Sequence, residues 1–204
     1  AGLAEIPAIV RELTDEQALE IQVIENLQRV NINPMEESDA FHRLLTKNIT
    51  SAEHVADKLG VSVKYVYDRM ALQKCIEPVK EAILEGKLTI GIGKQFARLP
   101  QGDQEKLWQE ADLEEMSSSE LKEQINRSFS LNLSEAVFST TDAKLVAKAG
   151  SCEKCQKRSG CNLLLFDDIR EEDICFDQAC YASKQQAYLN ALVKKLEKEG
   201  KKVV

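Results

Sequence analysis

The sequence is poor in the residues that interrupt regular structure. Among its 204 residues there are only 4 prolines and 9 glycines, while 43% of the residues are hydrophobic and 30% are charged. So few turn-forming residues exclude a fold of many short strands, and the hydrophobic content is too high for a disordered chain. The composition therefore predicts a mainly α-helical protein, long enough for one large domain or two to three small ones.

Long apolar runs and secretion signals are also missing. No stretch approaches the roughly 20 apolar residues that a membrane-spanning helix needs, and the opening residues AGLAEIPAIV have no signal-peptide pattern. We therefore expect a soluble cytoplasmic protein with no membrane partner. Because the chain starts at Ala1 in what resembles the middle of a domain, we also expect it to be a fragment.

The net charge of −7 at first disfavours a nucleic-acid partner, because phosphate binding is driven by Lys and Arg. The charges are unevenly distributed, however. Residues 43–74 carry six basic and three acidic side chains, whereas residues 103–123 carry two basic and eight acidic ones. The chain is therefore polarised, with a basic stretch ahead of an acidic one.

Helix-start signals recur along the first half of the chain. Thr14 and Gln17 have the spacing of a capping box ahead of a helix over 15–27, and Thr50 with Glu53 repeats that spacing. Asn33-Pro34 indicates the start of a helix that ends near Lys47. Further helices are expected at about 78–85, 89–99, 103–111 and 118–127.

The stretch ITSAEHVADKLGVSVKYVYDRMALQ has the pattern of a helix-turn-helix. Two short helices that cross steeply need a small residue where they touch, here Ala56, and a glycine with positive φ where the chain reverses, here Gly60. The helix from Val63 to Ala71 is then the recognition helix for a DNA major groove. The residues expected to contact DNA are Ser51, Ser62, Lys64, Tyr65, Tyr67 and Arg69.

Two packed helices with solvated charges are the alternative interpretation of this stretch. Arg69 also stands where many such motifs bury an apolar side chain. A structural role for Arg69 therefore stays open beside its role at DNA.

Residues 1 to about 110 resemble ParB-type partition proteins in unbroken order. The resemblance rests on ENLQR followed by NPMEES, on LGVSVKYVYDRMALQ, and on EGKLTIGIGKQFARLP. It implies a site-specific protein that binds double-stranded DNA at a centromere-like site and works with a ParA-like ATPase. It also implies a homodimer in the full molecule and an association with the nucleoid or a plasmid.

The same resemblance implies that ENLQR forms one wall of a CTP pocket. Carried over by position, Glu25 and Asn26 approach Mg²⁺ and the phosphates, while Arg29 neutralises phosphate charge. These residue types suit that chemistry, because Mg²⁺ takes oxygen ligands and a guanidinium suits an anion. The family's other phosphate-binding segment, a Gly-Glu-Arg-Arg-like box, normally precedes the position where this chain begins. We therefore expect this chain not to be an enzyme, with CTP hydrolysis and clamp closure confined to the intact protein.

Two other functions stay open at this point. A transcriptional regulator could use the same fold to bind an operator, and a nucleotide hydrolase or nuclease could be built on it. Against a nuclease, the sequence has no Asp, Glu and His cluster with an obvious metal geometry apart from Glu25 and Asn26.

Five of the 6 cysteines fall close together in the last third of the chain. Cys152 and Cys155 form a CxxC pair, and Cys175 and Cys180 form a CxxxxC pair, with Cys161 between them. Two such pairs suit a tetrahedral structural zinc site, and disulfides are the weaker interpretation in an intracellular protein. We expect these four as Zn²⁺ ligands and Cys161 as a small buried residue, with reduced or redox-active thiols as the alternative.

The cysteine segment also resembles a motif in the C-terminal part of some plasmid and mobile-element ParB-like proteins. The expected fold is thus mainly α: a multi-helix ParB-like DNA-binding domain, then a small cysteine-rich, zinc-binding module and a C-terminal helix. The expected boundaries are 1–33 for the end of the ParB N-terminal domain, 34–127 for the DNA-binding domain, 128–150 for a linker, and 151–204 for the cysteine-rich module with its helix.

Overall fold

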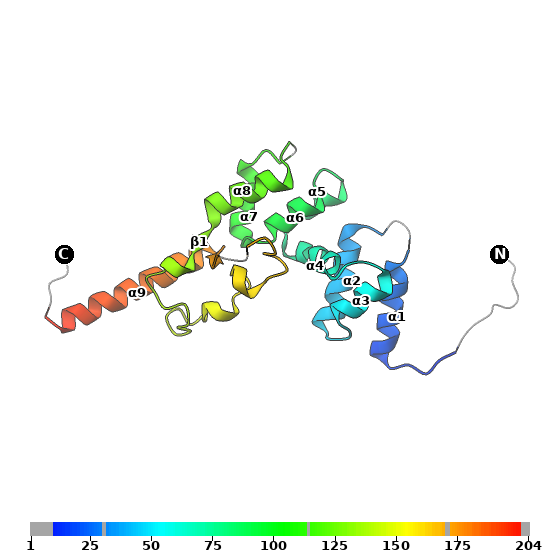
Figure 1. Cartoon of the computed structure of the whole chain (residues 1–204), viewed down its shortest axis with the longest axis horizontal. Helices are drawn as coiled ribbons and strands as arrows, with labels where there is room; N and C mark the ends of the chain where they lie inside the picture. Colours follow the sequence, from blue (N-terminus) through cyan, green and yellow to red (C-terminus); the bar gives the residue numbers. More distant parts are fainter. Residues whose placement is uncertain (1–9, 30–31, 114, 170–171, 201–204) are drawn as a thin grey trace, which may run out of the picture.

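The chain is mainly α-helical in a computed structural model, which describes residues 10–29, 32–113, 115–169 and 172–200 (Figure 1). Helices α1 and α9 lie at opposite ends of the molecule, with the other helices between them. This confirms the helical fold class predicted from the composition. The α-helices are α1 (Asp15–Leu27), α2 (Pro34–Thr46), α3 (Ala52–Leu59), α4 (Val63–Ala71), α5 (Glu77–Leu84), α6 (Ile90–Phe96), α7 (Gln101–Glu110), α8 (Ser118–Phe129) and α9 (Gln178–Lys198).

Short elements connect these helices. The strands β1 (Leu131–Asn132) and β2 (Ile174–Cys175) pair antiparallel, although 41 residues lie between them in the sequence. Single 3₁₀ turns occur at η1 (Leu72–Lys74), η2 (Leu133–Glu135), η3 (Cys152–Lys154) and η4 (Ser159–Cys161).

Local side-chain caps set the starts of the helices. Thr14 and Gln17 form the predicted capping box at α1, and Asn33 caps α2, with Pro34 in its first turn. The expected start of α3 was wrong in detail: Ser51 is the N-cap, and its Oγ accepts a hydrogen bond from His54 N at 3.2 Å. Because the cap is one residue later than Thr50, Glu53 falls short of the third helical position that a capping box requires.

A first hydrophobic core lies among α1, α2, α3 and α4. Phe41 and Leu44 from α2, Val55 from α3 and Val66 from α4 are fully buried in it. Gly60 ends α3 with a positive φ of 67°, which allows α4 to turn back against α3 as predicted. The helix-turn-helix is therefore held by the packing of all four helices.

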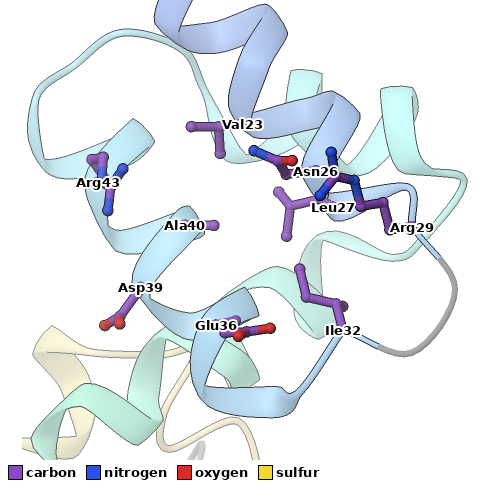
Figure 2. Close-up of a pocket in the computed structure, with 9 residues that line it drawn as sticks. All are labelled: Val23, Asn26, Leu27, Arg29, Ile32, Glu36, Asp39, Ala40 and Arg43. Atoms are coloured by element: carbon purple, nitrogen blue, oxygen red, sulfur yellow. The ribbon is translucent and has the colours of Figure 1, made fainter.

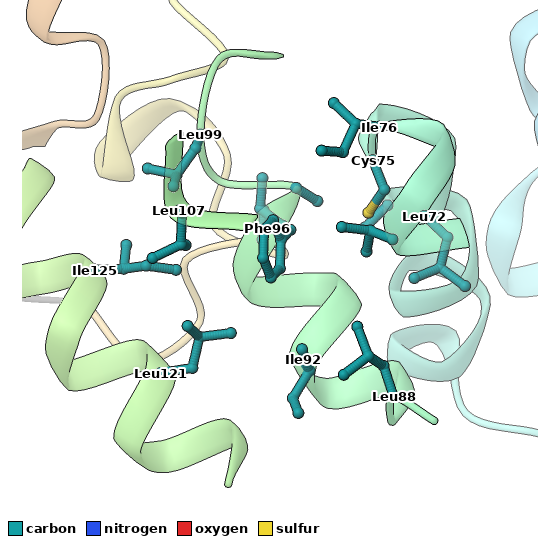
Figure 3. Packing of buried hydrophobic residues seen from close by; sticks show 14 of the residues in the cluster. Leu72, Cys75, Ile76, Leu88, Ile92, Phe96, Leu99, Leu107, Leu121 and Ile125 are labelled. Atoms are coloured by element: carbon teal, nitrogen blue, oxygen red, sulfur yellow. The ribbon is translucent and has the colours of Figure 1, made fainter. Parts of the chain in front are cut away.

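A second core lies among α5, α6, α7 and α8 (Figure 3). Leu72, Phe96 and Leu121 are fully buried there. The same core also contains four side chains from the cysteine-rich module (residues 151–204), namely Leu165, Phe166, Ile174 and Phe176. The helices and the cysteine-rich module therefore share one continuous core.

The segment that was expected to be a linker takes part in this packing. Leu133 and Phe138 are buried against Cys152 and Cys175, and β1 pairs with β2. A flexible linker would instead leave such side chains in contact with solvent. The segment lacks helical or strand periodicity because long-range contacts, rather than a long regular element, hold it in place.

Helix α9 projects from the cysteine-rich module (Figure 1). Lys184 is its buried residue, whereas Leu189 and Leu192 in its second half are exposed. Within the part of the chain that the structure describes, no helix is long and apolar enough to cross a membrane.

The Gly93→Ala substitution in α6 tests how tightly the second core is packed. A Cβ at this position would lie 2.6 Å from Ile83 Cδ1 and 2.7 Å from Leu72 Cδ2. We expect the free energy of unfolding, measured with urea, to fall by about 1–3 kcal/mol, because overpacking outweighs the better helix propensity of alanine.

Gly102→Ala in α7 is the matched control, since a Cβ there has no heavy atom within 4 Å. Its free energy of unfolding should be unchanged or rise by at most about 1 kcal/mol. Equal effects of the two substitutions would contradict the close contact at Gly93.

Candidate nucleic-acid interface

The start of α4 presents polar groups at the surface. Ser51 and Ser62 are exposed N-caps of α3 and α4, and Ser62 Oγ accepts a hydrogen bond from Tyr65 N at 3.0 Å. A hydroxyl that accepts in this way keeps its hydrogen as a donor. Lys64 lies in the same turn of α4 and is also exposed. The structure therefore places two of the six predicted DNA contacts, Ser62 and Lys64, at the start of the recognition helix, and Ser51 at the start of α3.

Tyr65 and Arg69 instead face α2. The Tyr65 hydroxyl donates to Glu37 Oε1 at 2.7 Å, and Arg69 Nε lies 2.5 Å from Glu37 Oε2. The Arg69 guanidinium also stacks over the Tyr65 ring, 4.6 Å from its centroid. Burial and the bond to Glu37 raise the pKa of Tyr65. These contacts fix α4 against α2 and favour the structural role left open for Arg69; contact of either residue with DNA stays a prediction.

The other side of α4 carries an ion-pair cluster that we call the α4–α6 cluster: Lys64, Asp68, Lys94 and Asp167. Lys94 Nζ lies 2.8 Å from Asp68 Oδ1 and 3.1 Å from Asp167 Oδ1, and Lys64 Nζ lies 2.5 Å from Asp167 Oδ2. Burial alone would lower the pKa of Lys64, but Asp167 and Asp68 raise it above its ordinary value. Lys64 is therefore a fixed positive charge at the start of α4.

Tyr67 lies on the face of α4 that meets the cysteine-rich module. It lines a pocket of about 430 Å³ together with Met70, Lys94, Asn162 and Leu164. Of the predicted DNA contacts, Tyr67 is thus placed against another part of this chain. Its contact with DNA stays a prediction.

A second pocket of about 430 Å³ lies between α1 and α2 (Figure 2). Asn26 and Arg29, both predicted nucleotide-binding residues, line it, whereas Glu25 is exposed and does not. Sequence reasoning missed Arg43 and Asp39 of α2 on the opposite wall, because no motif marks them. The pocket therefore pairs two guanidinium groups with carboxylates, a lining that suits a ligand of mixed charge.

The four predicted metal ligands line one small cavity of about 20 Å³. Cys152 and Cys155 approach it from η3, Cys175 from β2 and Cys180 from the first turn of α9. Burial raises the pKa of Cys175 to about 12. Cys161 does not line the cavity, and it is half-buried rather than buried as expected, with its Sγ 3.0 Å from Glu153 O.

Across the described ranges, no three His, Cys, Asp or Glu side chains already stand at the mutual spacing of a metal site. The cavity is also lined by a cationic side chain, Lys184. Lys184 Nζ donates to Cys152 Sγ at 3.1 Å and to Gly150 O at 2.7 Å. Nothing in the sequence indicates that Lys184 is buried beside the cysteines, because it stands in a helix whose other lysines are exposed.

Comparison with known proteins identifies the helical part of the chain. Residues 30–130 match the family model described as the ParB HTH domain. Residues 30–130 therefore form a ParB HTH domain. It is 37% identical over 111 residues to the probable chromosome-partitioning protein ParB of Neisseria meningitidis, covering 54% of this chain and 39% of that protein. It is 34% identical over 128 residues to stage 0 sporulation protein J of Bacillus subtilis, covering 62% and 45%.

A solved structure is similar as well. The C-terminally truncated chromosome-partitioning protein ParB from Caulobacter crescentus, complexed to the centromeric parS site, matches with a TM-score of 0.50 and 31% identity, covering 60% of this chain and 62% of that one. The family predicted from ENLQR, NPMEES and EGKLTIGIGKQFARLP is confirmed. The chain spans less than half the length of the two curated ParB relatives.

The ParB match ends just before β1, so the cysteine-rich module lies outside it. The likeness of this module to plasmid and mobile-element proteins stays a prediction. Arg98 of the ParB domain nevertheless pairs with Asp168 of the module and donates to Leu165 O at 3.0 Å. Lys122 Nζ of α8 lies 2.6 Å from the same Asp168 carboxylate. Charges therefore join the ParB domain to the residues beyond it.

Asp168→Asn should weaken this junction. Arg98 is 1% exposed, and removing its carboxylate partner leaves a buried charge unpaired. We expect the free energy of unfolding to fall by roughly 3 kcal/mol, the low end for a broken buried ion pair. Glu123→Gln, which breaks the exposed pair with Arg127, is the control and should change it by less than about 1 kcal/mol. Similar losses for both variants would contradict the burial of the junction.

The same junction predicts a pH dependence. Burial alone raises the pKa of Asp168, but hydrogen bonds from Arg98 and Lys122 outweigh it and lower the pKa from 3.8 to about 2. A depressed carboxyl pKa stabilises the fold above about pH 4, and that contribution is lost as the pH falls towards 2. In urea unfolding, the gap in stability between the wild type and Asp168→Asn should narrow over that window. A gap that stays constant would contradict the assignment.

Proposed function

We propose that this chain is the DNA-binding part of a partition protein and that it binds a centromere-like site through α3 and α4. The observation that supports this most is the exposed start of α4, with Ser62 and Lys64, within a ParB helix-turn-helix domain. The similar Caulobacter crescentus ParB was solved in complex with the centromeric parS site. A centromere-like DNA site is therefore the ligand that we assign to this surface.

The proposed contacts divide into two kinds. Ser51 and Ser62 donate to backbone phosphates and set the position of the domain on the duplex, while the first turn of α4 enters the major groove. Lys64 supplies the positive charge at this point. On binding, the DNA competes with Asp167 for Lys64, so part of the electrostatic gain is offset by the loss of that ion pair.

The intact protein is proposed to act as a homodimer with a ParA-like ATPase at the nucleoid or a plasmid. A dimer would present two helix-turn-helix units to two half-sites. The proposal of these partners is based on the family resemblance. The contacts with them would involve parts of the ParB relatives that this chain does not match.

The pocket between α1 and α2 is proposed as part of the nucleotide site of the intact protein. Arg29 and Asn26 line it and could hold the phosphates of CTP, with Arg43 as a further cation. Glu25 lies outside the lining, so its approach to Mg²⁺ requires a second segment of the full protein or a change in α1.

The cysteine-rich module is proposed to support the DNA-binding domain. Leu165 and Phe166 lie in the second core, and Lys157 Nζ donates to Leu99 O at 2.5 Å beyond the end of α6. Gln104 Nε2 donates to the same carbonyl at 3.0 Å, so Lys157 joins the module to the segment between α6 and α7.

Lys64→Ala tests the DNA surface. We expect roughly tenfold weaker binding to a duplex that carries the parS site, because one fixed positive charge at the start of α4 is lost. Fluorescence anisotropy at about 0.1 M salt measures the dissociation constant. Lys106→Ala on α7 removes the same charge from an exposed position and should change it by less than about twofold.

A scrambled duplex of equal length completes the design. The wild type should bind it at least about a hundredfold more weakly than the parS duplex, which is within the usual range for specific recognition. Equal binding of the two duplexes, or equal losses for Lys64→Ala and Lys106→Ala with unchanged helicity, would contradict the proposal.

A further inference from the structure

The cavity in the cysteine-rich module combines four thiols with a buried lysine. Cys152 and Cys155 lie about 20 residues before Cys175 and Cys180 in the sequence, but all four line the same small space. Its volume of about 20 Å³ is near that of a single water-sized sphere. The space therefore admits one small occupant rather than an organic ligand.

Lys184 is the second observation that points to an ion. Its side chain is 2% exposed, and its ammonium contacts the Cys152 sulfur and one carbonyl oxygen. Arg158 and Asp177 also line the cavity, but Arg158 pairs with Asp173, and no ion pair among the described residues includes Lys184. Burying an ammonium is costly unless an anionic group neutralises it.

A zinc tetrathiolate would provide that anionic group. Four thiols bind Zn²⁺ as thiolates and release four protons, and the resulting centre carries a net charge of −2. The positive charge of the buried Lys184 would reduce the net charge of the site from −2 to −1. An N–H group directed at a ligand sulfur is also the usual outer contact of a metal-bound thiolate.

The backbone around the ligands suits such a site. Cys175 Sγ accepts a hydrogen bond from Asp177 N at 3.5 Å, two residues further along the chain. Cys180 and Lys184 are four residues apart on α9, so they lie on the same side of that helix. Cys152 is the first residue of the 3₁₀ turn η3 and Cys155 directly follows it, and both line the cavity.

We propose that Cys152, Cys155, Cys175 and Cys180 bind one structural Zn²⁺ ion and that Lys184 is its buried counter-cation. The ligands close around the ion from their present positions at the cavity wall, and Lys184 keeps its contact with the Cys152 sulfur. With four protein ligands no coordination position stays open, so the centre is structural and not catalytic. This proposal does not depend on the DNA site.

Elemental analysis of the full chain, purified under reducing conditions without added metal, tests the ion. About one zinc per chain is expected, together with release of zinc and exposure of four additional thiols when a chelator is added in denaturant. Absence of zinc, with all 6 thiols of the sequence titrating freely, would overturn the proposal.

Ligand assignment uses a pair of matched variants. Cys180→Ser should lose zinc, whereas Cys161→Ser, whose sulfur does not line the cavity, should retain about one zinc per chain. Replacing zinc by cobalt(II) gives a readout that does not require full stability, because the thiolate-to-cobalt absorption scales with the number of sulfur ligands. Loss of zinc from Cys161→Ser, or an unchanged absorption in Cys180→Ser, would overturn the assignment.

The role of Lys184 has its own variants. Lys184→Met keeps much of the side-chain volume and removes the charge, so zinc affinity should fall about 10-fold to 100-fold in a competition with a metal indicator. Lys184→Arg restores the charge and should recover most of this loss. Equal zinc affinity of the wild type and Lys184→Met would overturn the counter-cation role.

Discussion

The burial of Arg98 is the constraint on which the arrangement of the chain depends. A guanidinium that is 1% exposed needs its charge neutralised, and Asp168 does so, while the carbonyl of Leu165 accepts a hydrogen bond from Nη2. Arg98 Nε has no hydrogen-bond partner among the described residues. Its position over the Phe166 ring adds a further contact, 5.4 Å from the centroid. Because these partners all come from one loop, satisfying Arg98 fixes that loop against α6. The loop then carries Asp167 to the start of α4.

This packing gives the recognition helix two supports. On one side Glu37 of α2 holds Tyr65 and Arg69, and on the other side Lys94 and Asp167 hold Asp68 and Lys64. Both sides of α4 are thereby fixed, while Ser62 at its start is exposed and Lys64 is exposed but paired with Asp167. A ParB domain that binds DNA through the first turn of α4 would present it on a preformed surface, so little ordering would be needed on binding.

The parts of the structure that could be predicted from the sequence are those with local causes. The caps at Thr14 and Asn33 and the reversal at Gly60 depend on residues within a few positions, and each was found where expected. Long-range pairs leave no such signal. Lys64 and Asp167 are 103 residues apart, so neither the ion pair nor the packing of the loop on α4 could be inferred. For the same reason the pairing of β1 with β2 was not predicted, and residues 128–150, which include β1, were expected to be a linker.

The candidate sites show the same division. The spacing of the cysteines was sufficient to select the four that line one cavity, whereas Lys184 resembles any other lysine of an amphipathic helix until its burial is seen. In the pocket between α1 and α2, Asn26 and Arg29 were found through the family resemblance, but Arg43 on the facing helix was not. Motifs therefore identified one wall of each site, and the fold supplied the other.

The most direct test of the account is hydrogen exchange of the full chain, measured by mass spectrometry with and without a saturating duplex that carries the parS site. The account predicts slower exchange on DNA binding in peptides that cover α3 and the first turns of α4, with no change in peptides from the second half of α9. Protection in the lysine-rich part of α9, without protection in α3 and α4, would contradict it.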